Sequence, residues 1–128
     1  MSSKGFLLDT HIFIWWMENK KRLDKNLFNI LKNPKNTIIL SAATIWEIVI
    51  KRAKGKLKTS ITLEKGIKQS GFIILPIQMT HVLGIQKLPH YHADPFDRLL
   101  ISQSQIESLT LITSDQKIWQ YDIDVLKA

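Results

Sequence analysis

Two aspartates stand three positions apart in the segment HADPFDRLLISQ, residues 92–103. Proline is favoured at the first position of a helix, so Pro95 predicts that a helix begins there. Asp94 would then be the N-cap, and Asp97 would lie in the first turn, where a carboxylate stabilises the helix dipole by ~0.3–1 kcal/mol. The same pair could instead supply oxygen ligands to a metal ion. This segment alone does not distinguish capping from metal binding.

Three other acidic residues follow or interrupt apolar segments. Asp9 follows the run FLL, Asp115 closes the segment LITSD, and Glu47 lies in the apolar stretch IWEIVI. An unpaired carboxylate at Asp9 would be costly, because apolar residues flank it closely on both sides. A helix that begins after Ser41 places Glu47 roughly 9 Å along its axis, and helical side chains lean back toward the N-terminus. These acids are therefore candidates for a shared role.

Short apolar runs alternate with helical segments along the chain. Strands are predicted at 5–8, 37–40, 72–75, 109–113 and 122–126. Helices are predicted at 12–17, 25–32, 42–55, 63–70, 81–86, 95–107 and 114–121. The candidate N-caps of four of these helices are Asp24, Ser41, Thr62 and Thr80. This alternation predicts the α/β class, with a parallel sheet that helices cover on both faces.

The predicted topology brings the acids to one edge of the sheet. In right-handed crossover units, helix N-termini gather at the edge where parallel strands end. The acids at that edge are Asp9, Glu47, Asp94, Asp97 and Asp115. Carboxylates gathered without a counter-charge raise one another's pKa and destabilise the fold, whereas a divalent cation removes the conflict. Because the ligands are oxygens and the chain has no cysteine, Mg²⁺ or Mn²⁺ is favoured over zinc.

The charge balance indicates a polyanionic partner. Of the 128 residues, 18 are Lys or Arg and 11 are Asp or Glu, which gives a net charge of +7 and a pI near 9.7. Such a basic chain favours nucleic acid, although solubility alone also accounts for the charge. An acidic cavity within a basic surface suits a metal ion that promotes attack on a phosphodiester bond.

Length and patterning suggest how the chain is organised and where it acts. One domain, 1–128, is expected, because no linker or repeat interrupts the chain. The absence of cysteine is compatible with a reducing, cytoplasmic location. Asp9, Thr10 and His11 interrupt the apolar N-terminal run, so neither a signal sequence nor a membrane span is predicted.

Histidines form a competing constellation. His11 lies two residues after Asp9, and His90 and His92 shortly precede Asp94. One of them could act as a general base, or His92 could support a metal ligand by hydrogen bonding.

A run of basic residues after Glu47 either stabilises a helix end or contacts phosphates. Its members are Lys51, Arg52, Lys54, Lys56 and Lys58.

Four motifs together resemble a known family. They are LLDTH at the first strand, WEIVIKRAKGKL, HADPFDRLLISQS, and LITSD before the last helical segment. In this order and spacing they resemble PIN-domain proteins, and most closely the VapC-type toxin nucleases of bacterial toxin–antitoxin pairs. The resemblance spans nearly the whole chain.

This resemblance implies a fold, an activity and a set of site residues. The implied fold is a three-layer α/β/α sandwich with a central parallel sheet of four to five strands. The implied activity is Mg²⁺-dependent endoribonuclease, with Mn²⁺ as a substitute, held inactive by a cognate antitoxin and commonly homodimeric. The catalytic and metal-binding residues carried over by motif are Asp9, Glu47, Asp97 and Asp115. Supporting positions are Asp94, which belongs to a DPFD variant of the motif, with Thr113 and Ser114 beside the last acid.

Three other interpretations compete with the toxin ribonuclease. A non-catalytic RNA-binding or regulatory module of the same fold would bind RNA whether or not the acids were intact. A DNA-directed nuclease would use the same chemistry on the other polymer. A receiver-like domain phosphorylated on an aspartate needs a lysine just after a late strand. Lys117 comes close to that position, but Glu47 would then have no role.

Overall fold

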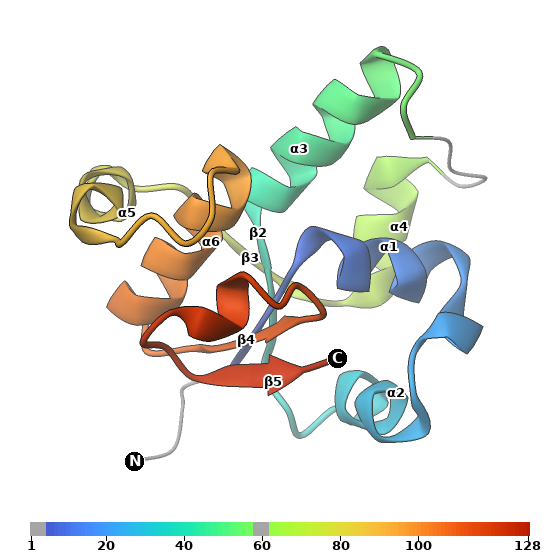
Figure 1. The fold of residues 1–128 in the computed structure, drawn as a ribbon. Coiled ribbons are helices and arrows are strands. Elements are labelled where there is room, and N and C mark those ends of the chain that lie inside the picture. The colour runs from blue at the N-terminus through green and yellow to red at the C-terminus, as the bar shows by residue number, and fades with distance from the viewer. Residues whose placement is uncertain (1–4, 58–61) are drawn as a thin grey trace.

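Five parallel strands form the central sheet (Figure 1). The computed structural model describes residues 5–57 and 62–128. The strands are β1 (Phe6–Leu8), β2 (Ile38–Ser41), β3 (Ile73–Leu75), β4 (Thr110–Thr113) and β5 (Val125–Lys127). They lie in the order β3-β2-β1-β4-β5, and each neighbouring pair is parallel. The predicted α/β class and the five predicted strands are confirmed.

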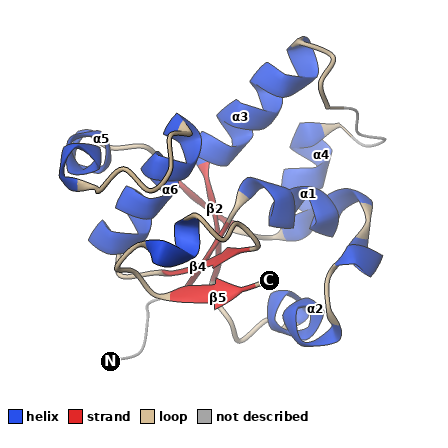
Figure 2. Cartoon of the chain, in the orientation of Figure 1, coloured by secondary structure: helices blue, strands red, loops and turns tan. Residues whose placement is uncertain are grey.

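Helices connect the strands (Figure 2). The α-helices of the described residues are α1 (Thr10–Glu18), α2 (Lys25–Lys32), α3 (Ala42–Ala53), α4 (Leu63–Ser70), α5 (Met79–Gly84) and α6 (Pro95–Ile106). Their 3₁₀ turns are η1 (Lys20–Arg22), η2 (Ile85–Lys87) and η3 (Ile118–Gln120).

The sheet is the middle layer of the predicted α/β/α sandwich. Successive residues of a strand face opposite sides of the sheet. Leu8 and Ile112 accordingly pack into one core with side chains of α1, α2 and α4, whereas Leu7 and Leu111 pack into a second core with α6 and η3. The core residues are fully or almost fully buried. Two apolar cores on opposite faces hold the central strands in place.

Side-chain caps start several helices where the sequence predicts them. Asp24 accepts a hydrogen bond from the Leu27 N–H at 2.7 Å, and Ser41 accepts one from the Ala43 N–H at 3.0 Å. Thr62 caps α4 in the same way. Each cap satisfies a backbone N–H that has no partner within its own helix. The predicted starts of α2, α3 and α4 are confirmed.

The predicted start of α5 is wrong. Thr80 is not its N-cap, because the helix begins at Met79, two residues earlier than predicted, and Gln78 occupies the cap position. The backbone N–H of Gln78 donates to Nδ1 of the buried His81 at 3.0 Å. The imidazole of His81 therefore accepts from the N–H of the cap residue itself, whereas a threonine cap would accept from a backbone N–H inside the helix.

The segment 114–121 is also less helical than predicted, since only the η3 turn forms there. The Asp115 N–H donates to the Thr113 hydroxyl at 3.0 Å, and the Lys117 N–H donates to the Asp115 carboxylate at 2.9 Å. These local side-chain hydrogen bonds form turns in place of the first turn of the predicted helix.

The strand β3 lies at an edge of the sheet and is poorly covered. Ile73 is 57% exposed and Ile74 is 41% exposed. The prediction that helices cover both faces is therefore wrong at this strand.

Lys58, the last member of the basic run, lies outside the described residues. In the described part of the chain, no helix is long and apolar enough to cross a membrane.

Candidate metal centre

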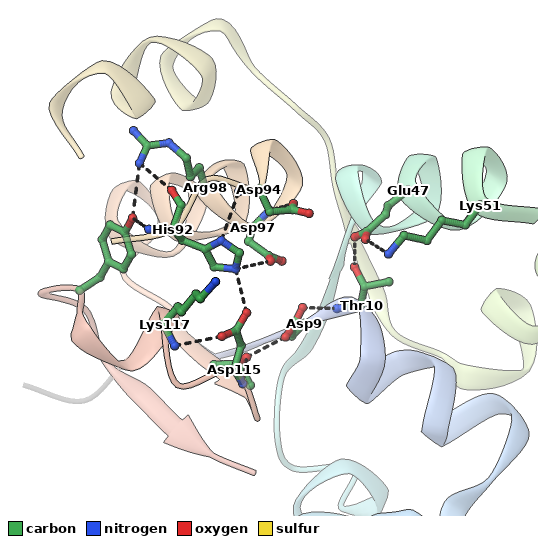
Figure 3. A network of polar contacts seen from close by, with 12 residues as sticks. Asp9, Thr10, Glu47, Lys51, His92, Asp94, Asp97, Arg98, Asp115 and Lys117 are labelled. Carbon is green, nitrogen blue, oxygen red and sulfur yellow. Dashed lines mark hydrogen bonds and ion pairs between the residues drawn. The ribbon is translucent and has the colours of Figure 1, made fainter. Parts of the chain in front are cut away.

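The predicted site acids lie around one cavity of about 250 Å³ at the carboxyl edge of the sheet (Figure 3). Carboxylates reach it from the end of β1, from α3, from the start of α6 and from the segment after β4. The lining residues, called the acidic cavity below, are Asp9, Thr10, His11, Glu47, Lys51, Asp94, Asp97, Ser114 and Asp115. The structure thus brings together all five acids that the sequence places at this edge.

Asp9 is a buried acid at the end of β1, and its side chain is also the N-cap of α1. One carboxylate oxygen accepts from the Thr10 N–H at 2.6 Å, and the other accepts from the Thr113 hydroxyl at 2.7 Å. Asp9 is 4% exposed. Burial raises the pKa of Asp9, and the hydrogen bonds from Thr113 and Thr10 oppose that rise. Helix α1 starts two residues earlier than predicted because Asp9 caps it.

Glu47 lies on α3 and is as buried as Asp9, at 4% exposed. One of its oxygens accepts from the Thr10 hydroxyl at 2.6 Å. The other forms an ion pair with the ammonium of Lys51, one turn further along the helix. The hydrogen bond to Glu47 raises the pKa of Lys51, which keeps the ammonium charged. Lys51, which the sequence placed in a basic run, is therefore a lining residue of the acidic cavity.

His92 connects the remaining two acids. Its Nε2 lies 2.8 Å from Oδ2 of Asp97 and 2.8 Å from Oδ2 of Asp115. The three side chains offer atoms within 4.8 Å of one another that could hold a metal ion. Figure 3 shows the imidazole between the two carboxylates. Among the histidines that the sequence singles out, His92 is the one in contact with two site acids.

The pKa of Asp97 is also raised, for two physical reasons. Its pKa is raised to about 8, first by burial and then by the negative charges of the neighbouring acids. Those acids are Asp9, Asp94, Glu47 and Asp115. Near neutral pH and without a cation, Asp97 therefore holds a proton for much of the time. A divalent cation would relieve the repulsion and lower that pKa.

The two aspartates of the DPFD segment have different contacts. Asp94 is the N-cap of α6, because its side chain accepts from the Asp97 N–H at 3.0 Å, after which Pro95 opens the helix. The cap predicted from the sequence is confirmed. The Asp97 carboxylate contacts His92 across the acidic cavity. Asp94 also lines the cavity, so capping does not remove it from the electrostatics of the site.

The supporting residues next to the last acid differ in their positions. Thr113 is fully buried, donates its hydroxyl to Asp9 and accepts from the Asp115 N–H, so it connects two site acids. Ser114 lines the cavity directly. His11 also lines the cavity, from an exposed position. His90 is exposed in the loop before α6.

The donor set fits a hard divalent cation. Every acid at the cavity offers carboxylate oxygens, which are the ligands that Mg²⁺ and Mn²⁺ prefer. Burial and then the neighbouring negative charges raise the pKa of Asp97, and a bound cation would offset both effects. Lys51 is a single cation among five acids, and its ammonium is paired with Glu47.

Sequence reasoning missed one group that shapes this site. Arg98 is only 9% exposed, and its guanidinium donates to the backbone carbonyls of Pro89 and His92 at 2.9 and 3.3 Å. It therefore holds the loop that carries His92. The available signal was the position of Arg98 directly before the apolar run LLI, residues 99–101. An arginine buried there needs several hydrogen-bond acceptors.

Comparisons with known proteins agree with this architecture. VapBC2 from Rickettsia felis bound to a promoter DNA fragment is similar with a TM-score of 0.68 and 21% identity, over 95% of this chain and 97% of that chain. DNA-bound VapBC from Salmonella typhimurium is similar with a TM-score of 0.68 and 14% identity, over 96% of this chain and 97% of that chain. A toxin–antitoxin complex from Klebsiella pneumoniae is similar with a TM-score of 0.66 and 19% identity, over 96% of this chain and 97% of that chain. No curated protein matches the chain.

At these identities the solved structures establish similarity of fold, and a family model gives the membership. The PIN domain model matches residues 6–124. This range runs from the first residue of β1 to the residue before β5 and contains every lining residue of the acidic cavity. Because the match covers most of its 128 residues, the chain belongs to the PIN domain family.

Proposed function

We propose that this protein is a metal-dependent endoribonuclease, the toxin of a toxin–antitoxin pair, with residues 1–128 forming one nuclease domain. The observation that carries the proposal is a cavity of about 250 Å³ lined by five carboxylates in a chain of net charge +7. Membership of the PIN family supports a nuclease, and similarity to VapBC complexes supports a toxin.

The acids would hold Mg²⁺, or Mn²⁺ as a substitute. The residues that would hold it are Asp9, Glu47, Asp97 and Asp115. When bound, the metal would lower the pKa of a water molecule and stabilise negative charge on the phosphate. Thr113 and Thr10 donate to Asp9 and Glu47, which fixes these carboxylates while leaving them further lone pairs.

Basic side chains in the acidic cavity and at the C-terminal end of α3 would hold the RNA backbone. Lys51 lines the cavity, and Arg52 follows it in the last turn of α3. Lys54 and Lys56 are exposed just beyond that helix. Contacts of this kind depend on charge and not on base identity, so RNA affinity should fall steeply as the salt concentration rises.

A protein partner is the second part of the proposal. The similar solved structures from Rickettsia felis and Salmonella typhimurium are VapBC complexes, and the one from Klebsiella pneumoniae is a toxin–antitoxin complex. Apolar side chains are exposed on β3 and α5, as expected of a surface that another protein covers. They include Ile73, Ile74, Met79, Val82 and Leu83. We propose a cognate antitoxin and a second copy of the chain as partners.

The decisive test of the activity compares RNA and DNA of the same sequence as substrates. Purified protein is incubated with each polymer in Mg²⁺, in Mn²⁺ and in excess EDTA, and cleavage is followed on gels. RNA cleavage that requires the metal is the expected result. Full cleavage in EDTA would contradict the metal mechanism. Cleavage of DNA in preference to RNA would identify a DNA-directed nuclease.

One variant separates a nuclease from a binding module. Asp97→Asn should bind RNA at least as tightly as the wild type, because the amide carries no negative charge to repel phosphates, yet it should lose nearly all RNA cleavage. Binding without any cleavage by the wild type would favour the non-catalytic module. The partner is tested by co-expression with any small open reading frame adjacent to the gene, followed by light scattering on the purified species.

A further inference from the structure

His92 connects two parts of the fold that the chain brings together from a distance. Asp97 is in the first turn of α6, and Asp115 follows β4. A single imidazole nitrogen, Nε2 of His92, lies 2.8 Å from a carboxylate oxygen of each. The His92 side chain is 11% exposed, and those of Asp97 and Asp115 are 16% and 33% exposed. The contact is therefore partly shielded from water.

The hydrogen bond at Nδ1 of His92 determines which of the two ring nitrogens carries the proton. The Asp94 N–H donates to Nδ1 of His92 at 3.1 Å. A ring nitrogen that accepts a hydrogen bond has no proton of its own, so the proton of the neutral ring lies on Nε2. Nε2–H then donates to both carboxylates and has no lone pair to offer a metal ion. In this tautomer His92 is a donor to the acids.

The backbone of His92 is held as firmly as its ring. Its N–H donates to the Tyr121 hydroxyl at 3.0 Å, and that hydroxyl donates to the Pro89 carbonyl at 2.8 Å. Arg98 donates to the carbonyls of both Pro89 and His92. Its further backbone acceptors are the carbonyls of Ile85 and Leu88. Two buried side chains, Arg98 and Tyr121, thus fix the loop that presents the imidazole.

We propose that His92 is a positioning residue of the metal site, which holds Asp97 and Asp115 in their ligand arrangement through Nε2–H. The proposal rests on the proposed function, because it takes these two acids as ligands. A carboxylate has about four lone-pair sites, so one hydrogen bond from His92 leaves each acid able to bind a cation. Partners of this kind orient ligands and typically change metal affinity by about 10–100-fold when removed.

Direct ligation by His92 is the competing arrangement, since its ring and the two carboxylates lie close enough to share an ion. It would require the proton to move to Nδ1, and the Asp94 N–H would then lose its acceptor. The two arrangements differ in the magnetic coupling expected between the imidazole and a bound Mn²⁺ ion. A ligating imidazole couples its ¹⁴N nucleus directly to Mn²⁺, whereas a positioning imidazole does not.

The test uses the full chain with Mn²⁺ alone, without RNA. Free Mn²⁺ is counted by its electron paramagnetic resonance signal as the ion is titrated into the protein. In His92→Asn the amide lies near the former Nδ1 position and cannot reach the acids, so Mn²⁺ affinity should fall by about 10–100-fold. In His92→Gln an amide N–H lies near the former Nε2 position, and most of the lost affinity should return. His90→Asn, an exposed neighbour in the same loop, is the matched control.

A second variant examines the support behind the ring. Tyr121→Phe keeps the buried ring and removes the hydroxyl that binds the His92 N–H and the Pro89 carbonyl. It should lower Mn²⁺ affinity in the same direction as His92→Asn, by a smaller factor. Near-ultraviolet circular dichroism of each variant checks that the fold is retained.

Each outcome decides for or against the proposal. Reduced affinity in His92→Asn, recovery in His92→Gln and no strong ¹⁴N coupling to Mn²⁺ are the expected results. Strong ¹⁴N coupling that disappears in His92→Asn would show direct ligation and overturn the positioning role. Equal Mn²⁺ affinity of the wild type and His92→Asn would overturn the inference about His92 alone. Absence of Mn²⁺ binding to the wild type would overturn the proposed metal-dependent function as well.

Discussion

The two halves of the acidic cavity are held in different ways. In the hydroxyl-held half, Asp9 and Glu47 are both 4% exposed and accept hydrogen bonds from the threonine hydroxyls of Thr113 and Thr10. In the imidazole-held half, Asp97 and Asp115 are more exposed and share one donor, His92. The first half is built on the ends of strands and on a helix, whereas the second depends on a loop.

This difference shows where rigidity comes from in the site. Thr10 and Thr113 lie at the ends of regular elements whose positions the packed sheet determines. His92 gains its position only through the contacts of Arg98 and Tyr121 with the loop. We expect the hydroxyl-held half to be in place without metal and the imidazole-held half to respond more strongly to a bound cation.

Removal of one ligand from the imidazole-held half should have the largest effect. Asp97→Asn should reduce single-turnover RNA cleavage by at least about 100-fold, because a neutral amide is a poor ligand for Mg²⁺. The exposed Asp122→Asn is the matched control for loss of one negative charge. If Asp97→Asn cleaved RNA at the wild-type rate, the imidazole-held half would have no part in catalysis.

Metal and pH should act together on stability through Asp97. Its pKa is about 8 in the folded chain and near the ordinary 3.8 when unfolded, so the folded state binds more protons between these values. The free energy of unfolding of the metal-free protein should therefore fall as the pH rises from about 4 to about 8. Mg²⁺ competes with that proton, so it should stabilise the protein more at about pH 8 than at about pH 5.

Thermal melts at the two pH values, with and without Mg²⁺, measure this linkage. Mg²⁺ at about 100 times its Kd should stabilise the fold by ~2.7 kcal/mol. Asp97→Asn should show a weaker pH dependence in the absence of metal. An identical pH dependence in the variant would mean that Asp97 does not hold the raised pKa.

A change in the hydroxyl-held half should act on the fold itself. Thr113→Val keeps the side-chain shape but leaves the buried Asp9 carboxylate without one of its donors and the Asp115 N–H without its acceptor. The free energy of unfolding should fall by about 1–3 kcal/mol, measured by denaturant titration, and Thr113→Ser should recover part of it. Unchanged stability in Thr113→Val would contradict the rigidity assigned to this half.

The smallest effect is expected at the helix cap beside the imidazole-held half. Asp94→Ala should lower the free energy of unfolding by ~1 kcal/mol, and Asp94→Ser, another good cap, should restore most of it. If Asp94 serves only as a cap, Asp94→Ser should also retain most of the cleavage activity. An inactive but stable Asp94→Ser would assign Asp94 to the metal site together with Asp97.

The sequence predicts the hydroxyl-held half better than the imidazole-held half. Asp9 and Glu47 could be placed from local patterns, because a strand end and a helix turn determine where a side chain goes. His92 could not, since its position depends on Tyr121, which is 29 residues away in the chain. The pairing of Lys51 with Glu47 was missed because a helix-end lysine usually points into solvent.

The same distinction explains the fold predictions. All five strands and the caps Asp24, Ser41 and Asp94 follow from short-range signals that tertiary contacts did not override. The start of α5 was wrong because the buried His81 binds the backbone N–H of the residue at the cap position. The roles assigned to the site acids stay predictions until the variants above are measured.

The pairing of β1 with β4 has a consequence for when the acidic cavity can form during synthesis. The hydrogen bond from Thr113 to Asp9 joins residues 104 positions apart, and β1 pairs directly with β4. During translation Asp9 emerges from the ribosome before Asp115, because it lies 106 positions earlier in the chain. A nascent chain that stops before β4 has acids but no acidic cavity. For a ribonuclease, this sheet order would keep the growing chain inert toward the messenger that encodes it and toward the ribosome that makes it.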